Sequence, residues 1–223
     1  MRGELHYTLT NVDGAITAVG AARACDLAPR FNIAPGQHAP VTIVSDGTRV
    51  IELMRWGLLP RWRGHGGKRG PLVNAAPLEA VAGTPLLRDA FKKQRVLVLA
   101  DGCYAWRELK QPVCFHPEPR TVIAFAGIWN INDDDGIASF ALLLGPPLVT
   151  RVNDAMPIVV PPTAFEAWLD PTVSPDAATD LLAAAEHPTG WPTDTVTTRM
   201  ASAQYDDAQC IAPLGNPNQG ELF

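Results

Sequence analysis

An apolar run in the middle of the chain, residues 95–106, constrains the fold more than any other stretch. Its first half is almost entirely aliphatic and ends in an Asp-Gly turn signal, a pattern typical of a strand buried on both faces. We therefore predict a core strand followed at once by a second strand. Because side chains alternate along a strand, Cys103 and Ala105 should face one side, and Tyr104 and Trp106 the other.

Length and charge indicate a single globular unit. The 223 residues contain no Ser/Gly-rich linker and no charge run, so we expect one domain over residues 1–223 with a frayed polar tail from residue 216. The formal net charge of −5 means that any contact with nucleic acid must be a local patch. No stretch approaches the roughly 18 to 20 apolar residues of a membrane span, and the first residues lack the layout of a signal peptide. We expect a cytoplasmic protein with no membrane partner.

The cysteines and histidines point to no metal site. The four cysteines form neither a Cys-x-x-Cys pair nor a disulfide framework, so in a reducing compartment they should be free thiols. The five histidines are scattered, without the spacing of metal ligands. We therefore expect neither a metal nor a cofactor.

The remaining elements are strands with a few short helices. An Asp-Gly turn joins residues 41–44 and 49–54 into a predicted hairpin. Further strands are predicted near the N-terminus, over 113–115, 121–129 and 139–144, and in the apolar stretch that ends at residue 160. Helices are predicted over 15–28, 84–93, 162–169 and 177–185. Without βαβ alternation, this order predicts an α+β fold around a strongly curved, mostly antiparallel, barrel-like sheet with short peripheral helices.

One basic patch stands out on this acidic chain, in residues 54–71. There Arg61, Trp62 and Arg63 lie in a Gly-rich stretch. Guanidinium groups bind phosphates and indoles offer stacking faces, so the patch suits single-stranded nucleic acid. The alternative is that one tryptophan belongs to the core and the remainder is a solvated loop.

Six motifs in register across nearly the whole chain resemble the SRAP (SOS response-associated peptidase) family. The resemblance implies a protein that binds and shields abasic sites in single-stranded DNA. The family uses an N-terminal cysteine whose amine and thiol close a thiazolidine on the sugar aldehyde, assisted by an asparagine, a glutamate and a histidine. The matching segments are Arg30-Phe-Asn-Ile-Ala-Pro-Gly36, Arg55-Trp-Gly-Leu-Leu-Pro-Arg-Trp62, Val73-Asn-Ala75, Ala100-Asp-Gly102 with Tyr104 and Trp106, Ala126-Gly-Ile-Trp129, and Met156-Pro157 before Trp168-Leu169.

The chain departs from that pattern where the chemistry takes place. Arg2 replaces the cysteine and is bulky enough to keep Met1 in place. Ala105 stands where the glutamate belongs, and Asn153 stands where the histidine belongs and cannot transfer a proton near neutral pH. Asn74 alone matches the catalytic set. Three positions that carry arginine in the family are also not basic here, where they are Glu4, Ala76 and Ala155.

Two residues offer alternative nucleophiles. Cys103 shares a strand face with Ala105, but it has no basic neighbour in the sequence that would lower the pKa of its thiol. The amine of a retained Met1 would form a Schiff base with the aldehyde of an abasic site, provided that Arg2 swings clear.

Two functions from different classes therefore compete. In the first, the protein binds single-stranded or abasic DNA without crosslinking or self-processing, through Arg30, Asn32, Arg61, Trp62 and Arg63 beside Asn74. In the second, the fold serves as a protein-interaction module, for instance in a phage or mobile element, and the acidic charge and missing arginines favour this alternative. A conventional hydrolase ranks third, because neither a Ser/His/Asp order nor paired carboxylates occur.

Overall fold

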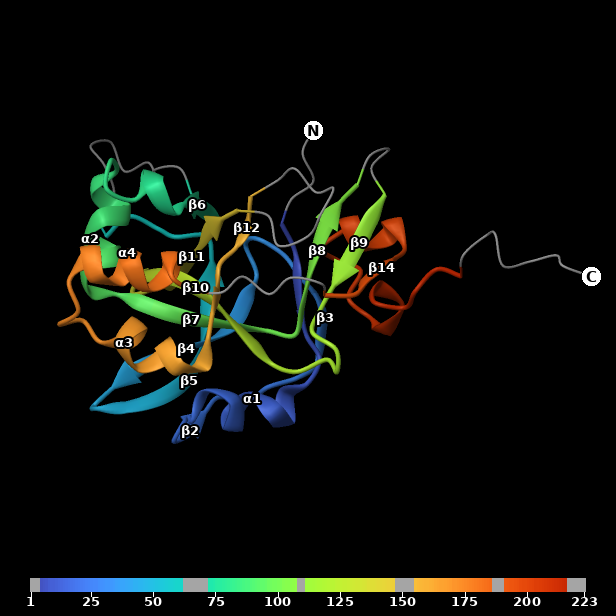
Figure 1. Ribbon diagram of the computed structural model, residues 1–223, viewed down its shortest axis with the longest axis horizontal. Coiled ribbons are helices and arrows are strands. Elements are labelled where there is room, and N and C mark those ends of the chain that lie inside the picture. Colours follow the sequence, from blue (N-terminus) through green and yellow to red (C-terminus); the bar gives the residue numbers. More distant parts are fainter. Residues whose placement is uncertain (1–4, 62–71, 108–110, 147–154, 186–190, 216–223) are drawn as a thin grey trace, which may run out of the picture.

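Two β-sheets that share one hydrophobic core make up most of the computed structural model (Figure 1). It describes residues 5–61, 72–107, 111–146, 155–185 and 191–215. The strands are β1 (Tyr7–Leu9), β2 (Arg23–Ala24), β3 (Arg30–Ile33), β4 (His38–Ser45), β5 (Thr48–Trp56), β6 (Ala75–Pro77), β7 (Arg95–Ala100), β8 (Gly102–Trp106), β9 (Pro112–Phe115), β10 (Ile123–Ile131), β11 (Ala138–Gly145), β12 (Met156–Pro157), β13 (Val159–Val160) and β14 (Thr193–Thr195). The α-helices are α1 (Val12–Val19), α2 (Pro85–Lys93), α3 (Phe165–Leu169) and α4 (Pro175–Ala183), and the 3-10 turns are Leu78–Ala80, Pro162–Ala164, Thr198–Ala201 and Ala208–Cys210.

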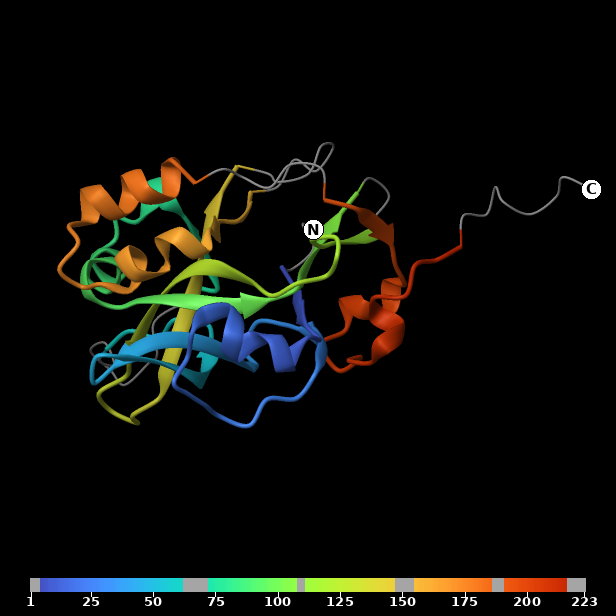
Figure 2. The ribbon, with the colours of Figure 1, turned by 60° about the horizontal axis from the view of Figure 1, so that its bottom comes forward.

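The smaller sheet is antiparallel throughout, in the order β14-β9-β8-β1-β3. The larger sheet follows the order β12-β11-β10-β7-β4-β5-β2, with β6 and β13 attached to β11 and β10. Helices α2, α3 and α4 gather at one end of the larger sheet, whereas the 3-10 turns after β14 lie beside the smaller one (Figures 1 and 2). The α+β class expected from the sequence is confirmed.

The predicted core strand links the two sheets. Strand β7 is buried at every residue and pairs with β10 and β4 in the larger sheet. The chain turns at Asp101, and β8 continues in the smaller sheet between β1 and β9. Cys103 and Ala105 face the main core, while Tyr104 packs in a second cluster with the C-terminal segment. The alternation expected from the sequence is therefore confirmed, and the side of β8 that carries Ala105 faces the interior.

The larger sheet curls back on itself, but it does not form a barrel. The ring closes where β11 pairs with β5 in parallel, and only two residue pairs, Ser139↔Arg55 and Phe140↔Trp56, make that seam. A regular barrel needs hydrogen bonding along the full length of every neighbouring strand. The prediction of strong curvature is confirmed, whereas the barrel-like closure is limited to this short seam. Parallel pairs of β2 with β5 and of β6 with β11 further interrupt the antiparallel pattern.

The predicted hairpin forms with the turn geometry that its sequence demands. Strands β4 and β5 pair antiparallel over eight residue pairs. At the turn, Asp46 has φ 50° and Gly47 has φ 74°, so both central residues are left-handed, as in a type I′ turn. The long β5 strand that results ends at Trp56, at the edge of the site described below.

The helix predicted over 15–28 is wrong in its bounds. Helix α1 spans Val12–Val19, because the Asn11 side chain accepts a hydrogen bond from Gly14 N at its start and Gly20 ends it in the left-handed conformation. The chain beyond is extended, and β2 adds to the larger sheet beside β5. The other helices lie close to their predicted positions, although the Thr84 side chain does not cap α2 and α4 begins two residues early, after Ser174.

Candidate functional site

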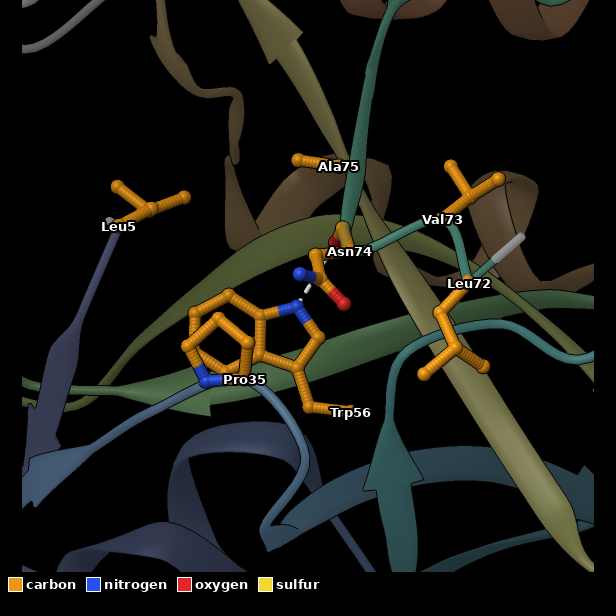
Figure 3. A pocket seen from close by; sticks show the side chains of 7 residues that line it. All are labelled: Leu5, Pro35, Trp56, Leu72, Val73, Asn74 and Ala75. Carbon is orange, nitrogen blue, oxygen red and sulfur yellow. Dashed lines mark hydrogen bonds between the residues drawn. The ribbon is translucent and has the colours of Figure 1, made fainter. Parts of the chain in front are cut away.

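A cavity of about 380 Å³ lies between the N-terminal end of β1 and the segment that leads into β6 (Figure 3). In Figure 3, Leu5 approaches from one side and residues 72–75 from the other, with Trp56 across the floor. Its walls are apolar except for one amide. The lining residues are Leu5, Pro35, Trp56, Leu72, Val73, Asn74 and Ala75.

Asn74, which by resemblance is expected to match the family's catalytic asparagine, lies in this wall. Its main-chain oxygen accepts hydrogen bonds from Trp56 Nε1 at 2.7 Å and from Leu142 N at 3.1 Å. Both donors belong to strands of the larger sheet, so the position of Asn74 is fixed through its backbone. Its side-chain amide makes no hydrogen bond to any described residue. That amide is therefore available to a ligand as both a donor and an acceptor.

Gly57 brings an arginine next to this amide. It has φ 125°, a conformation that favours glycine, and a Cβ there would lie 3.1 Å from both Arg55 Nη1 and Asn74 Oδ1. The Arg55 guanidinium and the Asn74 amide thus flank the same glycine. In the sequence, Arg55 belongs to a motif that resembles the family, but no role at the site was predicted for it. Its place directly before Trp56-Gly57 was the signal that could have found it.

Ala105 lies next to the cavity, although it is not among the lining residues. Strands β1 and β8 pair antiparallel with Tyr7 opposite Cys103, and extending this register by two residues places Leu5 opposite Ala105. The hydrogen bond from Tyr104 N to the main-chain oxygen of His6 supports the same register. Ala105 is 6% exposed. A carboxylate at this position would therefore lie beside Leu5 at the cavity wall, where the alanine methyl group offers no proton transfer.

Cys103 is not positioned to replace the missing nucleophile. Its side chain is fully buried in the main core, and its thiol donates to the main-chain oxygen of His6 at 3.3 Å. Burial, with a smaller contribution from Cys114, raises the pKa of the Cys103 thiol well above its usual range. Because the thiolate is the reactive form, this geometry argues against a nucleophilic role for Cys103.

Asn32 has internal partners that hold the C-terminal segment, which bears on the expected contact with DNA. Asn32 is completely buried, its amide group donates to three main-chain oxygens of the C-terminal segment, and its Oδ1 is 2.6 Å from His6 Nδ1. Both polar atoms of its side chain are engaged inside the protein, which weakens the expectation that Asn32 contacts DNA. The three acceptors are Met200, Ser202 and Tyr205.

Arg30 is also engaged within the protein. Its Nε donates to Asp206, and its Nη2 donates to Gln37 Oε1 at 2.9 Å. The same Asp206 carboxylate accepts hydrogen bonds from the main-chain N–H groups of Phe31 and Asn32. A phosphate would have to compete with this carboxylate for Arg30, which weakens the expectation that Arg30 contacts DNA.

Arg61 is exposed and forms a surface ion pair with Asp133 at 3.4 Å. Exposed pairs of this kind are worth about 0 to 1 kcal/mol, so the guanidinium can exchange its partner for a phosphate at little cost. Trp62 and Arg63, and the family positions occupied by Arg2 and Asn153, lie outside the described residues. If the family architecture holds, Arg2, Asn74, Ala105 and Asn153 should converge on one pocket, because catalytic groups must reach the same substrate atom. This stays a prediction. The structure describes only that Asn74 lines the cavity and that Ala105 lies next to it.

Within the described ranges, no group of three histidine, cysteine or carboxylate side chains is arranged to hold a metal ion. None of the helices in the described part of the chain combines the length and apolar character that crossing a bilayer requires.

Comparison with known proteins gives a consistent family. The family model described as SOS response associated peptidase (SRAP) matches residues 2–203. The abasic site processing protein YoqW of Bacillus subtilis is 28% identical over 165 residues, covering 69% of this chain and 73% of that protein, and YedK of Escherichia coli is 24% identical over 161 residues, covering 69% and 70%.

Solved structures share the fold. A crystal structure of a protein from Bacteroides thetaiotaomicron has a TM-score of 0.74 at 18% identity, covering 94% of this chain and 99% of that one. A phage-related protein from Bordetella bronchiseptica has a TM-score of 0.71 at 23% identity, covering 86% and 93%. The likeness shows the fold alone, but the family model spans most of the sequence. The chain therefore belongs to the SRAP family.

Proposed function

We propose that this protein binds single-stranded DNA at abasic sites without forming a covalent crosslink. The observation that carries the proposal is the side-chain amide of Asn74, which lies in the wall of an otherwise apolar cavity and makes no hydrogen bond to a described residue. The names of the relatives, abasic site processing proteins, supply the class of ligand.

The cavity suits a sugar that has lost its base. Its volume of about 380 Å³ is within the range of small-molecule sites, and its apolar wall matches the carbon face of a deoxyribose. The Asn74 amide can donate to one sugar oxygen and accept from a hydroxyl group. Arg61, and with it Trp62 and Arg63, would hold the strand by phosphate contacts and base stacking.

The covalent chemistry of the family lacks its groups in this sequence. Closing a thiazolidine requires an amine and a thiol on one residue, and position 2 carries an arginine. Position 105 carries a methyl group and position 153 an amide, so neither transfers a proton near neutral pH. We infer that both crosslinking and self-processing are lost.

The test is the binding of a fluorescent single-stranded oligonucleotide, with and without a stable tetrahydrofuran abasic analogue, measured by anisotropy across a salt series. We expect weak, salt-sensitive binding. Trp62→Ala should weaken it by about 1 to 3 kcal/mol and Arg61→Ala by less, because stacking contributes more than one phosphate contact. No denaturant-stable adduct should appear with a true abasic site. An adduct trapped by borohydride would instead point to the Met1 amine.

A protein-interaction module is the second candidate. It is favoured by the engagement of Arg30 with Asp206 and of Asn32 with the C-terminal segment, because two expected DNA contacts are thereby used internally. The acidic net charge of −5 points the same way. Absence of any DNA binding at low salt would favour this alternative.

A further inference from the structure

We infer that Arg55 binds the phosphate next to the abasic sugar. Arg55 and Asn74 then form a two-residue site at the edge of the cavity, in which Arg55 holds the phosphate and Asn74 holds the sugar. The inference rests on the proposed DNA binding and adds to it a residue, a ligand group and a position on the strand.

Among the described residues, the Arg55 guanidinium has no neutralising partner. Its Nη1 donates to the main-chain oxygen of Gly57 at 3.3 Å, and no carboxylate of a described residue lies within ion-pair distance. Five other arginines do have such partners. These pairs are Arg23 with Glu52, Arg30 with Asp206, Arg61 with Asp133, Arg88 with Asp89 and Arg120 with Asp101.

The contacts of Arg55 within the described structure use few of its hydrogen-bond donors. A guanidinium has five N–H donors, and the hydrogen bond to Gly57 occupies one of them at a long distance. The remaining donors are those that bind phosphate in a two-point geometry. Arg55 is half-buried, which lowers the local dielectric and strengthens its attraction for an anion relative to a fully exposed arginine.

The Arg55 guanidinium and the Asn74 side-chain amide both lie next to Gly57. The point where its Cβ would stand is 3.1 Å from Arg55 Nη1, 3.1 Å from Asn74 Oδ1 and 3.9 Å from Leu72 Cβ. Leu72 and Asn74 both line the cavity, so the guanidinium lies close to two lining residues, although Arg55 is not itself one of them. A sugar against Leu72 would place its phosphate toward Arg55 while a sugar oxygen meets the Asn74 amide.

The experiment is a double-mutant cycle between protein and DNA. We would measure binding of a single-stranded oligonucleotide carrying one tetrahydrofuran abasic analogue, with a phosphate or a neutral methylphosphonate on its 5′ or its 3′ side. These ligands are tested with the wild type, Arg55→Gln and Arg55→Lys. The control is Arg23→Gln, which removes the same charge from a side chain that is 68% exposed on β2, a strand that lies away from β6 in Figure 1.

We expect Arg55→Gln to weaken binding about fivefold to tenfold and to lower the slope of log K against log salt by about 0.7, the value for one phosphate on a single strand. Arg55→Lys should retain the slope but lose part of the affinity, because lysine keeps the charge without the two-point geometry. The methylphosphonate should weaken the wild type on one side of the sugar only, and it should have no effect on Arg55→Gln.

Three results overturn the inference. In the first, the effects of Arg55→Gln and of the methylphosphonate on the binding free energy add up for both the 5′ and the 3′ position. This means that the Arg55 guanidinium contacts neither phosphate. Equal effects of Arg55→Gln and Arg23→Gln mean that only net charge matters. If the wild type binds none of the oligonucleotides at low salt, the proposed function fails together with this inference, whereas either of the first two results leaves DNA binding itself intact.

Discussion

Trp56 donates its indole N–H to the main-chain oxygen of Asn74 at 2.7 Å. The indole is completely buried, stacks on Phe140 with ring centroids 6.1 Å apart, and lies 5.0 Å from the ring of Tyr7. Through this bond the aromatic core of the larger sheet determines where the Asn74 side chain lies. Trp56 therefore both lines the cavity and holds the backbone of Asn74 in place.

Replacing Trp56 by phenylalanine removes that bond and leaves a gap beside Asn74. We expect a loss of about 2 to 4 kcal/mol in the free energy of unfolding, from lost packing and a weakened buried hydrogen bond. Affinity for abasic DNA should fall as well, because Asn74 is no longer held in place. Chemical denaturation and anisotropy measure the two effects. Phe140→Leu is the control, since it disturbs the same stack but keeps the indole bond. Unchanged DNA affinity in Trp56→Phe would show that this bond does not position the site.

Asn32 holds the C-terminal segment against β3. In Asn32→Ala the main-chain oxygen of Met200 loses the Asn32 donor, and a buried oxygen left unpaired costs about 1 to 3 kcal/mol. The oxygens of Ser202 and Tyr205 also lose the Asn32 donor, but they keep hydrogen bonds from Tyr205 N and from the Cys210 thiol. We expect faster amide hydrogen exchange across residues 198–211 and little change in β7 or β10. Asn130→Ala is the matched control, because Asn130 is also buried but donates to Leu59. Equal exchange in the two variants would contradict this role.

The fold was largely predictable because its strongest signals are local. The run before Asp101 and the Asp-Gly hairpin turn each specify a conformation within a few residues, and both elements formed as expected. Helix α1 was misplaced because alanine content outweighed the two caps, Asn11 and Gly20, that set its ends. The short seam between β5 and β11 carries no local signal at all, since it depends on how the sheet twists.

The site was less predictable because its geometry depends on contacts between distant segments. Asn74 was identified by resemblance, but the approach of Arg55 to it requires the turn at Gly57, which only the folded chain reveals. The contacts of Arg30 and Asn32 within the protein could not be predicted for a related reason. Their partners lie about 170 residues further along the chain, at 200–206, so a basic and an amide side chain that look available in the sequence are occupied in the structure.

The four thiols should differ in reactivity. Cys103, Cys114 and Cys210 are completely buried, whereas Cys25 is partly exposed. We expect a small thiol reagent at about pH 8 to modify Cys25 in the native protein and all four cysteines after unfolding. Counting labelled thiols by mass spectrometry tests this, with Cys25→Ser as the control that should leave the native protein unlabelled. Rapid labelling of Cys103 in the native protein would contradict its burial and would support Cys103 as a nucleophile.

Stability should fall in alkaline solution through the buried thiols. Burial raises the pKa of Cys114 from 9.0 to about 11, partly offset by Arg120. Because the folded-state pKa is raised, the thiol favours the folded state fully below about pH 9, and this contribution is lost as the pH rises through about 11. The loss is on the order of 1 to 3 kcal/mol. Denaturation of the wild type and of Cys114→Ala at several pH values measures it, and the variant should show the shallower decline. Parallel curves would contradict the assignment to Cys114.

The last prediction concerns the covalent chemistry of the family. Thiazolidine formation joins the aldehyde carbon of the abasic sugar to one nitrogen and one sulfur and releases the carbonyl oxygen as water, so it requires an N-terminal cysteine. Arg2→Cys supplies the thiol, and its small side chain allows removal of Met1 and exposure of the amine. We therefore expect Arg2→Cys to crosslink slowly to abasic single-stranded DNA, in a band that survives denaturing electrophoresis, while the wild type gives none.

Adding Ala105→Glu and Asn153→His should then raise the crosslinking rate, because general acid-base groups contribute about 10² to 10⁴ in rate. The position of Ala105 opposite Leu5 makes part of this outcome a structural test, since a carboxylate there must reach the cavity from a residue that is 6% exposed. Burial would raise the pKa of that glutamate, which suits it to donate a proton near neutral pH. If Ala105→Glu accelerates crosslinking only together with Asn153→His, the two positions act as a pair. If neither change accelerates the Arg2→Cys variant, positions 105 and 153 do not face the abasic sugar, and the absence of the glutamate and the histidine does not limit crosslinking.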